Sequence, residues 1–431
     1  MSLIDRLTEI WHGNSSPCLI RGADEIRLSD LKAVVVSGIV EIAPGDVVAL
    51  IGDIDPPSVV ALLRLIDIGA IIMPLTRANE SEHDYCFEVG RVEVILDSRG
   101  IRRLSAQRKD PMIDRLREKG HPGLILFSTG STGPPKAILH DFTVFLERFA
   151  EPRPTLRTMA FLLFDHIGGI NTLLHALFNR GVVVSPSRRT VADVLRCCRE
   201  HEVELLPTTP TFLRMMLLSG LIPDQFPPHL RVVTYGTERM DQPTLDELCR
   251  LLPDVDFRQT FGMSELGIMR VQSKDRSSLF MRIGGTGIKT RIRDNILHIY
   301  SPTRMLGYLN APSPFDDEGW YDTKDVVETD GEYIRITGRT TDVVNVGGLK
   351  FVLSDVESAA LEFPGVALAR AHARPNPITG HHVELTVQPD PAVAFDQMAL
   401  LDHLRLKLPT QKVPRRLRVG EVAVGHRFKK L

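Results

Sequence analysis

The chain has 431 residues, of which 43% are hydrophobic and 25% are charged, a composition typical of a globular protein with two or three domains. Its net charge of −2 gives no electrostatic reason to expect binding to nucleic acid or to an anionic membrane. The five cysteines form no C-x-x-C pair, which argues against a zinc site or a disulfide framework and fits a reducing compartment. No apolar run reaches the ~18 residues of a membrane helix, and the N-terminus has no signal-like core, so we expect a cytoplasmic protein without a membrane span.

Apolar runs of strand length alternate with helical patterns over most of the chain. The first predicted strands are 46–51, 70–74 and 92–96, with a helix at 57–68, and the polar residues 98–121 are expected to form a surface connection. From residue 142 to residue 259 the pattern predicts strands at 158–164, 182–184, 204–207, 230–234 and 256–259, and helices at 142–149, 169–178, 191–201, 211–218 and 242–252. Such alternation predicts a mostly parallel sheet covered by helices on both faces.

The pattern changes after residue 282. Short strands are predicted at 290–292, 296–300 and 333–337, and strands at 366–371 and 383–387 with helices at 354–363 and 396–407 follow a glycine-punctuated stretch. We therefore predict an α/β protein in three parts. These are a large domain over residues 1–338 with mostly parallel sheets and an antiparallel subdomain, a hinge at 339–345, and a small mobile α+β domain at 346–431.

A stretch rich in glycine and hydroxyl groups follows the apolar segment 124–127. Glycine backbone N–H groups and hydroxyls suit a polyphosphate, and a lysine adds positive charge. A flexible surface loop is the alternative. The stretch is not a Walker loop, which ends in Gly-Lys-Ser/Thr, because a proline precedes its lysine. Its candidate ligand-binding residues are Ser128, Thr129, Gly130, Ser131, Thr132, Gly133 and Lys136.

The segment Asp165-His166-Ile167-Gly168-Gly169 places a histidine between a predicted strand and an apolar helix. The two glycines allow close approach of the backbone to a ligand. A lone histidine at such a place is more often structural, and that alternative stays open.

Two further segments follow predicted strands, and ligands of open parallel sheets bind beyond the carboxyl ends of strands. Tyr235-Gly236-Thr237-Glu238 is the first, and an ordinary turn is its alternative. The second is Gln259-Thr260-Phe261-Gly262-Met263-Ser264-Glu265, which offers an aromatic face for a purine and a carboxylate for Mg²⁺. A helix-start cap is the alternative for the second.

Asp325 and Arg339 occur in the segments Trp320-Tyr321-Asp322-Thr323-Lys324-Asp325 and Gly338-Arg339. A carboxylate and a guanidinium both suit ribose hydroxyls. Each residue alone is a weak signal, because aspartate and arginine usually lie on surfaces.

Taken in order, these segments resemble the motifs of adenylate-forming enzymes, the superfamily of acyl- and aryl-CoA synthetases, peptide-synthetase adenylation domains and luciferases, and most closely the acyl-CoA synthetase-like members. The resemblance runs from about Asp46 to the C-terminus. It implies that the loop up to Lys136 binds ATP phosphates and that the remaining ATP site comprises Tyr235, Gly236, Thr237, Phe261, Gly262, Ser264, Asp325 and Arg339.

The same resemblance assigns the chemistry to further residues. It implies that Glu265 holds Mg²⁺ and that His166, Gly168, Gly169 and Gly236 lie beside the acid. It also implies a thiol-channel loop with Gly347, Gly348 and Lys350, and a catalytic lysine near the C-terminus. The family pattern is Gly-Lys there, whereas this chain has His426 after the glycine, so Lys429 is the first candidate, Lys430 the second and a solvated basic tail the alternative. Two more departures are Lys324 at a usual glycine and Thr341 at the usual pivot.

The implied activity is an AMP-forming ligation of an acid to a thiol. ATP and Mg²⁺ convert an aliphatic or aromatic carboxylic acid to an acyl-adenylate with release of pyrophosphate, and the acyl group passes to CoA. Transfer to the phosphopantetheine of an acyl carrier protein is an alternative. A non-catalytic nucleotide-binding paralogue and a P-loop NTPase are the competing interpretations, and no nucleic-acid partner is expected.

Overall fold

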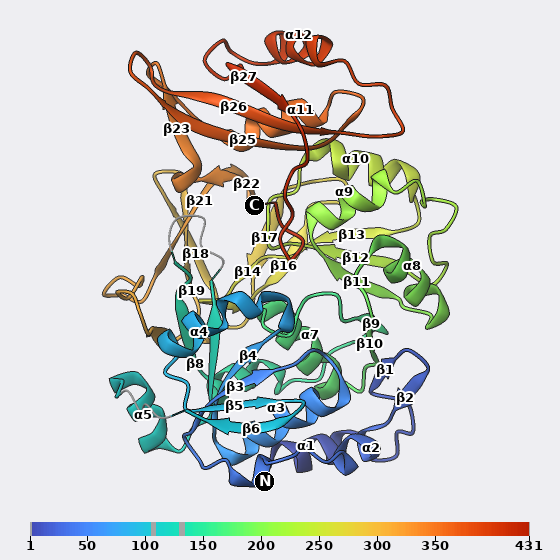
Figure 1. Ribbon diagram of the computed structural model, residues 1–431, viewed down its shortest axis with the longest axis vertical. Helices are drawn as coiled ribbons and strands as arrows, with labels where there is room; N and C mark the ends of the chain where they lie inside the picture. The colour runs from blue at the N-terminus through green and yellow to red at the C-terminus, as the bar shows by residue number, and fades with distance from the viewer. Residues whose placement is uncertain (1, 105–108, 129–133, 431) are drawn as a thin grey trace.

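The structure is a computed structural model that describes residues 2–104, 109–128 and 134–430 (Figure 1). A small C-terminal domain, red in Figure 1, lies on a larger domain built from the rest of the chain. The expected phosphate-loop residues from Thr129 to Gly133 lie outside the described residues. Within the described ranges, no helix is both long and apolar enough to cross a membrane.

The first sheet of the large domain has the strand order β20-β8-β7-β4-β3-β5-β6. Strand β3 pairs in parallel with β4 and β5, β4 pairs in parallel with β7, and β8 returns antiparallel to β7. The carboxyl ends of the parallel strands therefore share one edge, where the stretch beginning at Ser128 follows β7. The bounds are β3 Val47–Ile51, β4 Ile71–Leu75, β5 Val94–Asp97, β6 Gly100–Arg103, β7 Gly123–Phe127, β8 Ala137–Asp141 and β20 Gly307–Tyr308.

The second sheet has the order β13-β12-β11-β9-β10-β1-β2 and is parallel except at β2. Its bounds are β1 Leu19–Arg21, β2 Asp24–Ile26, β9 Thr158–Met159, β10 Val183–Ser185, β11 Leu205–Thr208, β12 Val232–Tyr235 and β13 Asp256–Gln259. The strand predicted at 158–164 is wrong beyond Met159. Its apolar residues Phe161 and Phe164 instead lie in cores on either side of this sheet, as a buried connection.

Two helices lie between the sheets, which explains why they are apolar on nearly every side. Helices α3 (Pro56–Ile68) and α7 (Ile167–Phe178) share one core with Val48 of the first sheet and Val183 of the second. The α3 helix begins at a cap in which Asp55 accepts from the backbone N of Ser58. Helices α1 (Leu3–Ile10), α2 (Leu28–Ala33) and α6 (Phe142–Leu146) border the same core.

Other helices cover the outer faces of the two sheets. Helices α4 (His83–Val89) and α5 (Pro111–Lys119) pack on the first sheet, and α8 (Val191–Glu200), α9 (Pro210–Leu218) and α10 (Gln242–Leu251) pack on the second. The covered, mostly parallel sheets confirm the predicted fold class. Helix α5 and strand β6 lie in the segment 98–121 that was expected to be only a surface connection.

The predicted antiparallel subdomain is a sheet of order β16-β17-β22-β21-β19-β18, with the short hairpin β14-β15 beside it. Phe261 and Met281 lie in its core. The bounds are β14 Gly262–Met263, β15 Gly267–Ile268, β16 Arg270–Ser273, β17 Met281–Gly284, β18 Lys289–Arg293, β19 Ile296–Tyr300, β21 Tyr321–Asp330 and β22 Tyr333–Arg339.

The small domain is a sheet of order β24-β23-β26-β25, with β27 beside β26 and two helices packed on it. A short 3-10 turn at Thr340–Asp342 connects it to β22. The expected hinge 339–345 therefore covers the end of β22, this turn and the start of β23. The bounds are β23 Val343–Val346, β24 Leu349–Val352, β25 Val366–Asn376, β26 Gly380–Pro389, β27 Arg416–Val419, α11 Leu353–Leu361 and α12 Gln397–Lys407.

Candidate active site

The last residues of the chain leave the small domain and enter the large one as a tight hairpin (Figure 1). Val424 and Lys430 pair across this C-terminal hairpin, and the backbone N of Gly425 donates to the carbonyl O of Lys429 at 2.8 Å. Phe428 at its tip has a φ of 53°, a left-handed conformation that costs a residue with a side chain about 1–2 kcal/mol. The hairpin therefore holds its tip in a shape that the surrounding contacts must stabilise.

Those contacts come from the second sheet of the large domain. The ring centroid of Phe428 lies 5.0 Å from that of Phe161 and 5.5 Å from that of Phe212. The hydroxyl of Thr209, which follows β11, donates to the carbonyl O of Phe428 at 2.7 Å. An aromatic cluster and one hydrogen bond thus seat the tip of the C-terminal hairpin.

The seated hairpin brings Lys429 to the carboxyl edge of the second sheet. Lys429 lines a cavity of about 10 Å³ together with His166, Thr209 and Thr237. Burial lowers the pKa of Lys429 to about 8; the carboxylate of Glu238 opposes this shift, and nearby arginines add to it. Lys429 is therefore an ammonium at neutral pH whose charge is removed by mild alkali.

His166 caps the N-terminus of α7 and faces the same cavity. Its Nδ1 accepts a hydrogen bond from the backbone N of Gly168 at 3.0 Å. Since Nδ1 is an acceptor, the neutral ring carries its proton on Nε2. Burial, reinforced by the positive charges of Lys429 and Arg427, lowers the pKa of His166 to about 3. His166 is thus a neutral hydrogen-bond donor at physiological pH.

A buried ion pair joins the hairpin to the residue before this histidine. A guanidinium nitrogen of Arg427 lies 2.7 Å from Oδ2 of Asp165, and these side chains are 11% and 2% exposed. Burial alone would raise the pKa of Asp165, but Arg427 and His426 outweigh that effect and lower it. Oδ1 of Asp165 has no hydrogen-bond partner in the described part of the chain. Sequence analysis did not predict this pair, whose members are 262 residues apart.

The structure separates the two lysine candidates. Nζ of Lys430 lies 2.6 Å from Oε2 of Glu357, a buried residue of α11 in the small domain. Lys429, one residue earlier, points to the opposite side, into the cavity beside His166. Lys430 is thus held by an ion pair within the small domain, whereas Lys429 lines the cavity.

A second group of side chains lies around Tyr308. The hydroxyl of Tyr308 donates to Oε1 of Glu265 at 2.8 Å, and Nζ of Lys136 lies 5.0 Å from the centre of the Tyr308 ring. Burial and the negative charge of Glu265 raise the pKa of Tyr308, so its proton stays on the phenol. Glu265 and Lys136 thus meet around one tyrosine, which sequence analysis did not single out.

Asp325 and Arg339 lie opposite each other on paired strands β21 and β22. Nε of Arg339 donates to Oδ1 of Asp325 at 2.9 Å. Burial raises the pKa of Asp325, and the guanidinium of Arg339 only partly offsets this. Lys324 adopts a φ of 62° and forms an ion pair with Asp322, so this departure from the expected glycine turns its charge away from Asp325.

The Tyr235–Glu238 segment forms a close turn at the end of β12. The side chain of Tyr235 is buried in the core, and Gly236 lies so close to Thr260 that a Cβ on it would be 2.3 Å from the threonine hydroxyl. Thr237, with a φ of 71°, lines the cavity beside Lys429. Glu238 accepts from the backbone N of Thr211 at 2.8 Å.

The Phe261–Glu265 segment crosses from the second sheet to the antiparallel subdomain. Phe261 is buried in the subdomain core, Gly262 begins β14, and the carbonyl O of Ser264 accepts from Nε2 of His140 at 2.6 Å. Of this segment, Glu265 has a side-chain contact with the Tyr308 and Lys136 group. A set of three or more metal-binding side chains was not found in the described residues.

The expected thiol-channel loop is the turn between β23 and β24. Gly347 and Gly348 have φ values of 57° and 91°, and the backbone N of Gly348 donates to Oδ1 of Asn345 at 3.0 Å. Both glycines and Lys350 are exposed. The contacts described for this turn lie within the small domain, so in this arrangement it is Lys429 that the small domain presents to the site.

Polar contacts hold the small domain in this arrangement. Arg214 of α9 donates to the carbonyl O of Ala367 at 3.0 Å and of Val366 at 2.6 Å. Arg239 donates to the hydroxyl of Ser354 at 2.5 Å. With the Arg427 pair, these contacts place the hairpin over the carboxyl edge of the second sheet.

Gly169 is required by its surroundings, and this predicts a loss of stability on substitution. A Cβ at this position would lie 2.0 Å from the carbonyl O of Leu163 and 2.8 Å from that of Leu162. We expect Gly169→Ala to reduce the free energy of unfolding by about 1–3 kcal/mol, measured by urea denaturation, because the backbone before His166 has to move. Gly420→Ala is the control, since no atom lies within 4 Å of its Cβ position. Equal stability of both variants would contradict the prediction.

Residues 37–295, more than half of the chain, match the family described as AMP-binding enzyme. A sulfoacetate–CoA ligase from Cupriavidus necator is 24% identical over 335 residues, which cover 70% of this chain and 64% of the relative. A nicotinic acid–CoA ligase from Aspergillus fumigatus is 26% identical over 260 residues, which cover 54% and 44%. The chain thus spans less than two thirds of the length of these curated relatives.

Solved structures share the fold over nearly the whole chain. An anthranilate–CoA ligase in complex with anthranoyl-AMP superposes with a TM-score of 0.81 at 16% identity, covering 100% of this chain and 95% of that chain. An o-succinylbenzoate–CoA synthetase from Bacillus subtilis, in complex with its acyl-adenylate intermediate, gives a TM-score of 0.76 at 19% identity, covering 99% and 96%. The family match over more than half of the sequence, together with this shared fold, shows that the chain belongs to the AMP-binding enzyme family, as the order of its motifs predicted.

Proposed function

We propose that this protein activates a carboxylic acid with ATP, forming an acyl-adenylate and pyrophosphate. It then transfers the acyl group to a thiol, for which CoA is the first candidate. The seated hairpin carries the proposal, since it places an ammonium from the small domain beside the neutral donor His166. The relatives named above, which are CoA ligases, support the choice of reaction and acceptor.

In the first half-reaction the acid attacks the α-phosphorus of ATP, and the protein mainly positions groups and neutralises charge. Lys429 would bind one carboxylate oxygen and an α-phosphate oxygen, and Nε2 of His166 would donate to the acid. Lys136 and the loop beginning at Ser128 would hold the departing pyrophosphate. Asp325 and Arg339 would bind the ribose, and the turn from Tyr235 to Thr237 would border the adenine.

The residues present fit one Mg²⁺ ion. Glu265 is one carboxylate near Lys136, and Mg²⁺ is usually held by one or two carboxylates together with phosphate oxygens and water. When bound, the ion would neutralise phosphate charge. Tyr308 would keep the Glu265 carboxylate oriented through its hydroxyl.

In the second half-reaction the small domain would turn about residues 339–345. The C-terminal hairpin would leave the site, and the turn with Gly347, Gly348 and Lys350 would replace it to admit the thiol. The hinge and this loop rest on the family resemblance and on the position of the connecting turn at Thr340–Asp342.

A pyrophosphate-release assay tests the proposal. Aliphatic, aromatic and amino acids are each supplied with MgATP, with and without CoA. We expect acid-dependent release with at least one aliphatic or aromatic acid and faster turnover with CoA. Turnover with a phosphopantetheinylated carrier protein in place of CoA would assign the acceptor to a carrier. No release with any acid would reject the proposal in favour of a non-catalytic nucleotide-binding protein.

The pKa of Lys429 predicts an alkaline limit to adenylate formation. The ammonium is present below about pH 8 and is lost as the pH rises through that value, so we expect the rate to fall about tenfold per pH unit above it. Glu238→Gln removes the carboxylate that raises this pKa and should move the midpoint to lower pH. Pyrophosphate release is measured in both proteins from about pH 6 to about pH 10, a range that spans the titration of the Lys429 ammonium. An unmoved midpoint in the variant would contradict the assignment to Lys429.

A further inference from the structure

The cavity beside Lys429 is too small for the body of an acid. Its volume is about 10 Å³, roughly what one water molecule requires. The carboxylate to be activated belongs there under the proposed function, so the rest of the molecule has to occupy another space.

A larger cavity shares a wall with the small one. Its volume is about 360 Å³, and Leu163 lines both. It lies where the carboxyl ends of β3, β4 and β5 face the second sheet, so that Gly52, Thr76 and Ser98, which follow these strands, border it. Leu50 and Leu96 give it an apolar side. Leu163, with 7% exposure, is the side chain that both spaces have in common.

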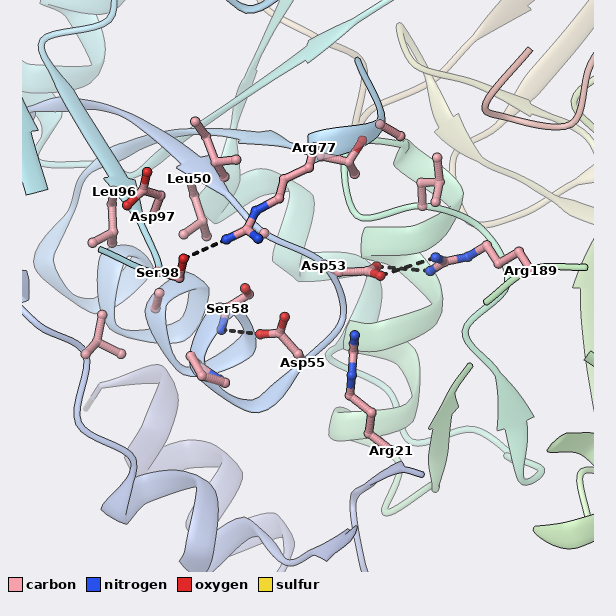
Figure 2. A pocket seen from close by; sticks show the side chains of 18 residues that line it. Arg21, Leu50, Asp53, Asp55, Ser58, Arg77, Leu96, Asp97, Ser98 and Arg189 are labelled. Carbon is pink, nitrogen blue, oxygen red and sulfur yellow. Dashed lines mark hydrogen bonds and ion pairs between the residues drawn. The ribbon is translucent and has the colours of Figure 1, made fainter. Parts of the chain in front are cut away.

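The charges around this larger cavity are partly neutralised by one another. Arg189 forms a bidentate ion pair with Asp53, with N–O distances of 3.0 and 3.2 Å (Figure 2). Asp97 pairs with Arg99 at 3.1 Å. Asp55 accepts from the backbone N of Ser58 at the start of α3, where the helix dipole offsets its charge (Figure 2).

Two positive side chains remain. Arg77 donates to the hydroxyl of Ser98 at 2.6 Å, and Arg21 donates to the carbonyl O of Ile54 at 3.2 Å and to the hydroxyl of Ser185 at 3.3 Å. In the described part of the chain neither has a carboxylate within ion-pair distance, and each guanidinium keeps further N–H groups. Figure 2 shows Arg77 and Arg21 on opposite sides of the cavity, with Asp55 and Ser58 between them.

We propose that the larger cavity receives the distal part of the acid and that Arg77 and Arg21 bind a second anionic group there, such as a carboxylate, sulfonate or phosphate. The proposal rests on the proposed function, because it extends the acid site. The acid would enter with its first carboxylate at Lys429, pass the side chain of Leu163 and present its apolar middle to Leu50 and Leu96. Rotation of Leu163 would join the two cavities.

The test compares α,ω-dicarboxylic acids, from succinic to suberic, with monocarboxylic acids of the same length. We expect the wild-type kcat/KM for pyrophosphate release to favour one dicarboxylic acid over its monocarboxylic partner by about tenfold or more, as one charge-assisted pair allows. Arg77→Gln should raise the KM for the dicarboxylic acid about tenfold and leave the monocarboxylic acid unchanged. Arg77→Lys should keep most of the preference, and Arg258→Gln, an exposed arginine of β13, is the matched control.

The outcomes separate this inference from the proposed function. Activation of acids without a dicarboxylate preference, or equal effects of Arg77→Gln on both acids, overturns the inference and leaves the proposed function intact. A rise in the KM for CoA instead of the acid assigns the anion to the thiol substrate and also overturns it. No activation of any acid rejects both.

A variant of Leu163 tests the path between the cavities. Leu163→Phe should block acids of more than a few carbons and spare acetate, whereas Leu163→Met, which conserves volume, should keep the wild-type length profile. Thermal unfolding of both variants shows whether they fold. If folded Leu163→Phe and wild type show the same dependence of activity on acid length, the proposed path past Leu163 is wrong.

Discussion

Adenylate formation should fall by about 10²- to 10³-fold in Lys429→Gln, because the variant removes a preorganised positive charge from the site of charge development. The ammonium belongs to the C-terminal hairpin and lines the same cavity as His166. Burial lowers the pKa of Lys429 to about 8. Single-turnover measurement of acyl-adenylate gives the rate directly.

Lys430→Gln is the matched control for this experiment. It changes the neighbouring residue in the same way, but its ammonium pairs with Glu357 in the small domain at 2.6 Å. Glutamine can still donate a hydrogen bond to that carboxylate, so we expect adenylate formation within a few-fold of wild type. A large loss in Lys430→Gln with wild-type rates in Lys429→Gln would reverse the assignment.

Asp165→Asn should reduce adenylate formation by about 10²- to 10³-fold while leaving thioester formation from supplied acyl-adenylate close to wild type. Removing one partner of a buried ion pair costs about 3–5 kcal/mol, and the partner of Asp165 in this structure is Arg427 of the seated hairpin. The second half-reaction, under the proposed function, needs the hairpin released. Separate measurement of the two half-reactions shows whether the loss is confined to adenylate formation.

A double-mutant cycle with Arg427→Gln tests whether loss of the ion pair between Asp165 and Arg427 causes the slower adenylate formation. Because the two side chains are in contact, the double variant should lose much less than the sum of the single losses. Arg258→Gln, which changes an exposed arginine of β13 in the same way, is the control. Additive losses, or equal losses in both half-reactions, would show that Asp165 acts in some other way than by seating the hairpin.

Much of the fold could be predicted from local patterns. Strand β3, helix α3 and strand β4 are strongly apolar segments bounded by turn residues, and the structure places them within a residue or two of the prediction. Helix α7 begins directly after its cap His166, where the motif placed the change from strand to helix. These elements are specified by their own sequence, since burial and capping act over a few residues.

Other elements depend on partners far along the chain. Strand β1 is three residues long and gains its place by pairing with β10, so its own sequence carries almost no periodic signal. The buried connection after Met159 has strand-like apolarity because cores lie on both sides of it. Helix α5 has charged residues on its outer face, which made its segment resemble a surface connection.

The candidate site also combines features that local motifs predict with contacts between residues far apart in the chain. The motifs predicted which segments would gather at the carboxyl edges of the sheets, but not the contacts of the last residues. The choice between two adjacent lysines depends on the direction of a hairpin whose tip is stabilised by Phe161, Phe212 and Thr209. Residues such as Arg427 and Tyr308 belong to no motif, so only their positions in space associate them with the site.

If the acid attacks the α-phosphorus of ATP, one oxygen of its carboxylate must end in AMP. An acid whose carboxylate is enriched in a heavy oxygen isotope is incubated with MgATP, CoA and the protein, and the products are examined by mass spectrometry. We expect one labelled oxygen in AMP, because the bond to the α-phosphorus forms through the carboxylate oxygen and later breaks on the carbonyl side. Label in inorganic phosphate with ADP as the nucleotide product, or unlabelled AMP, would contradict it.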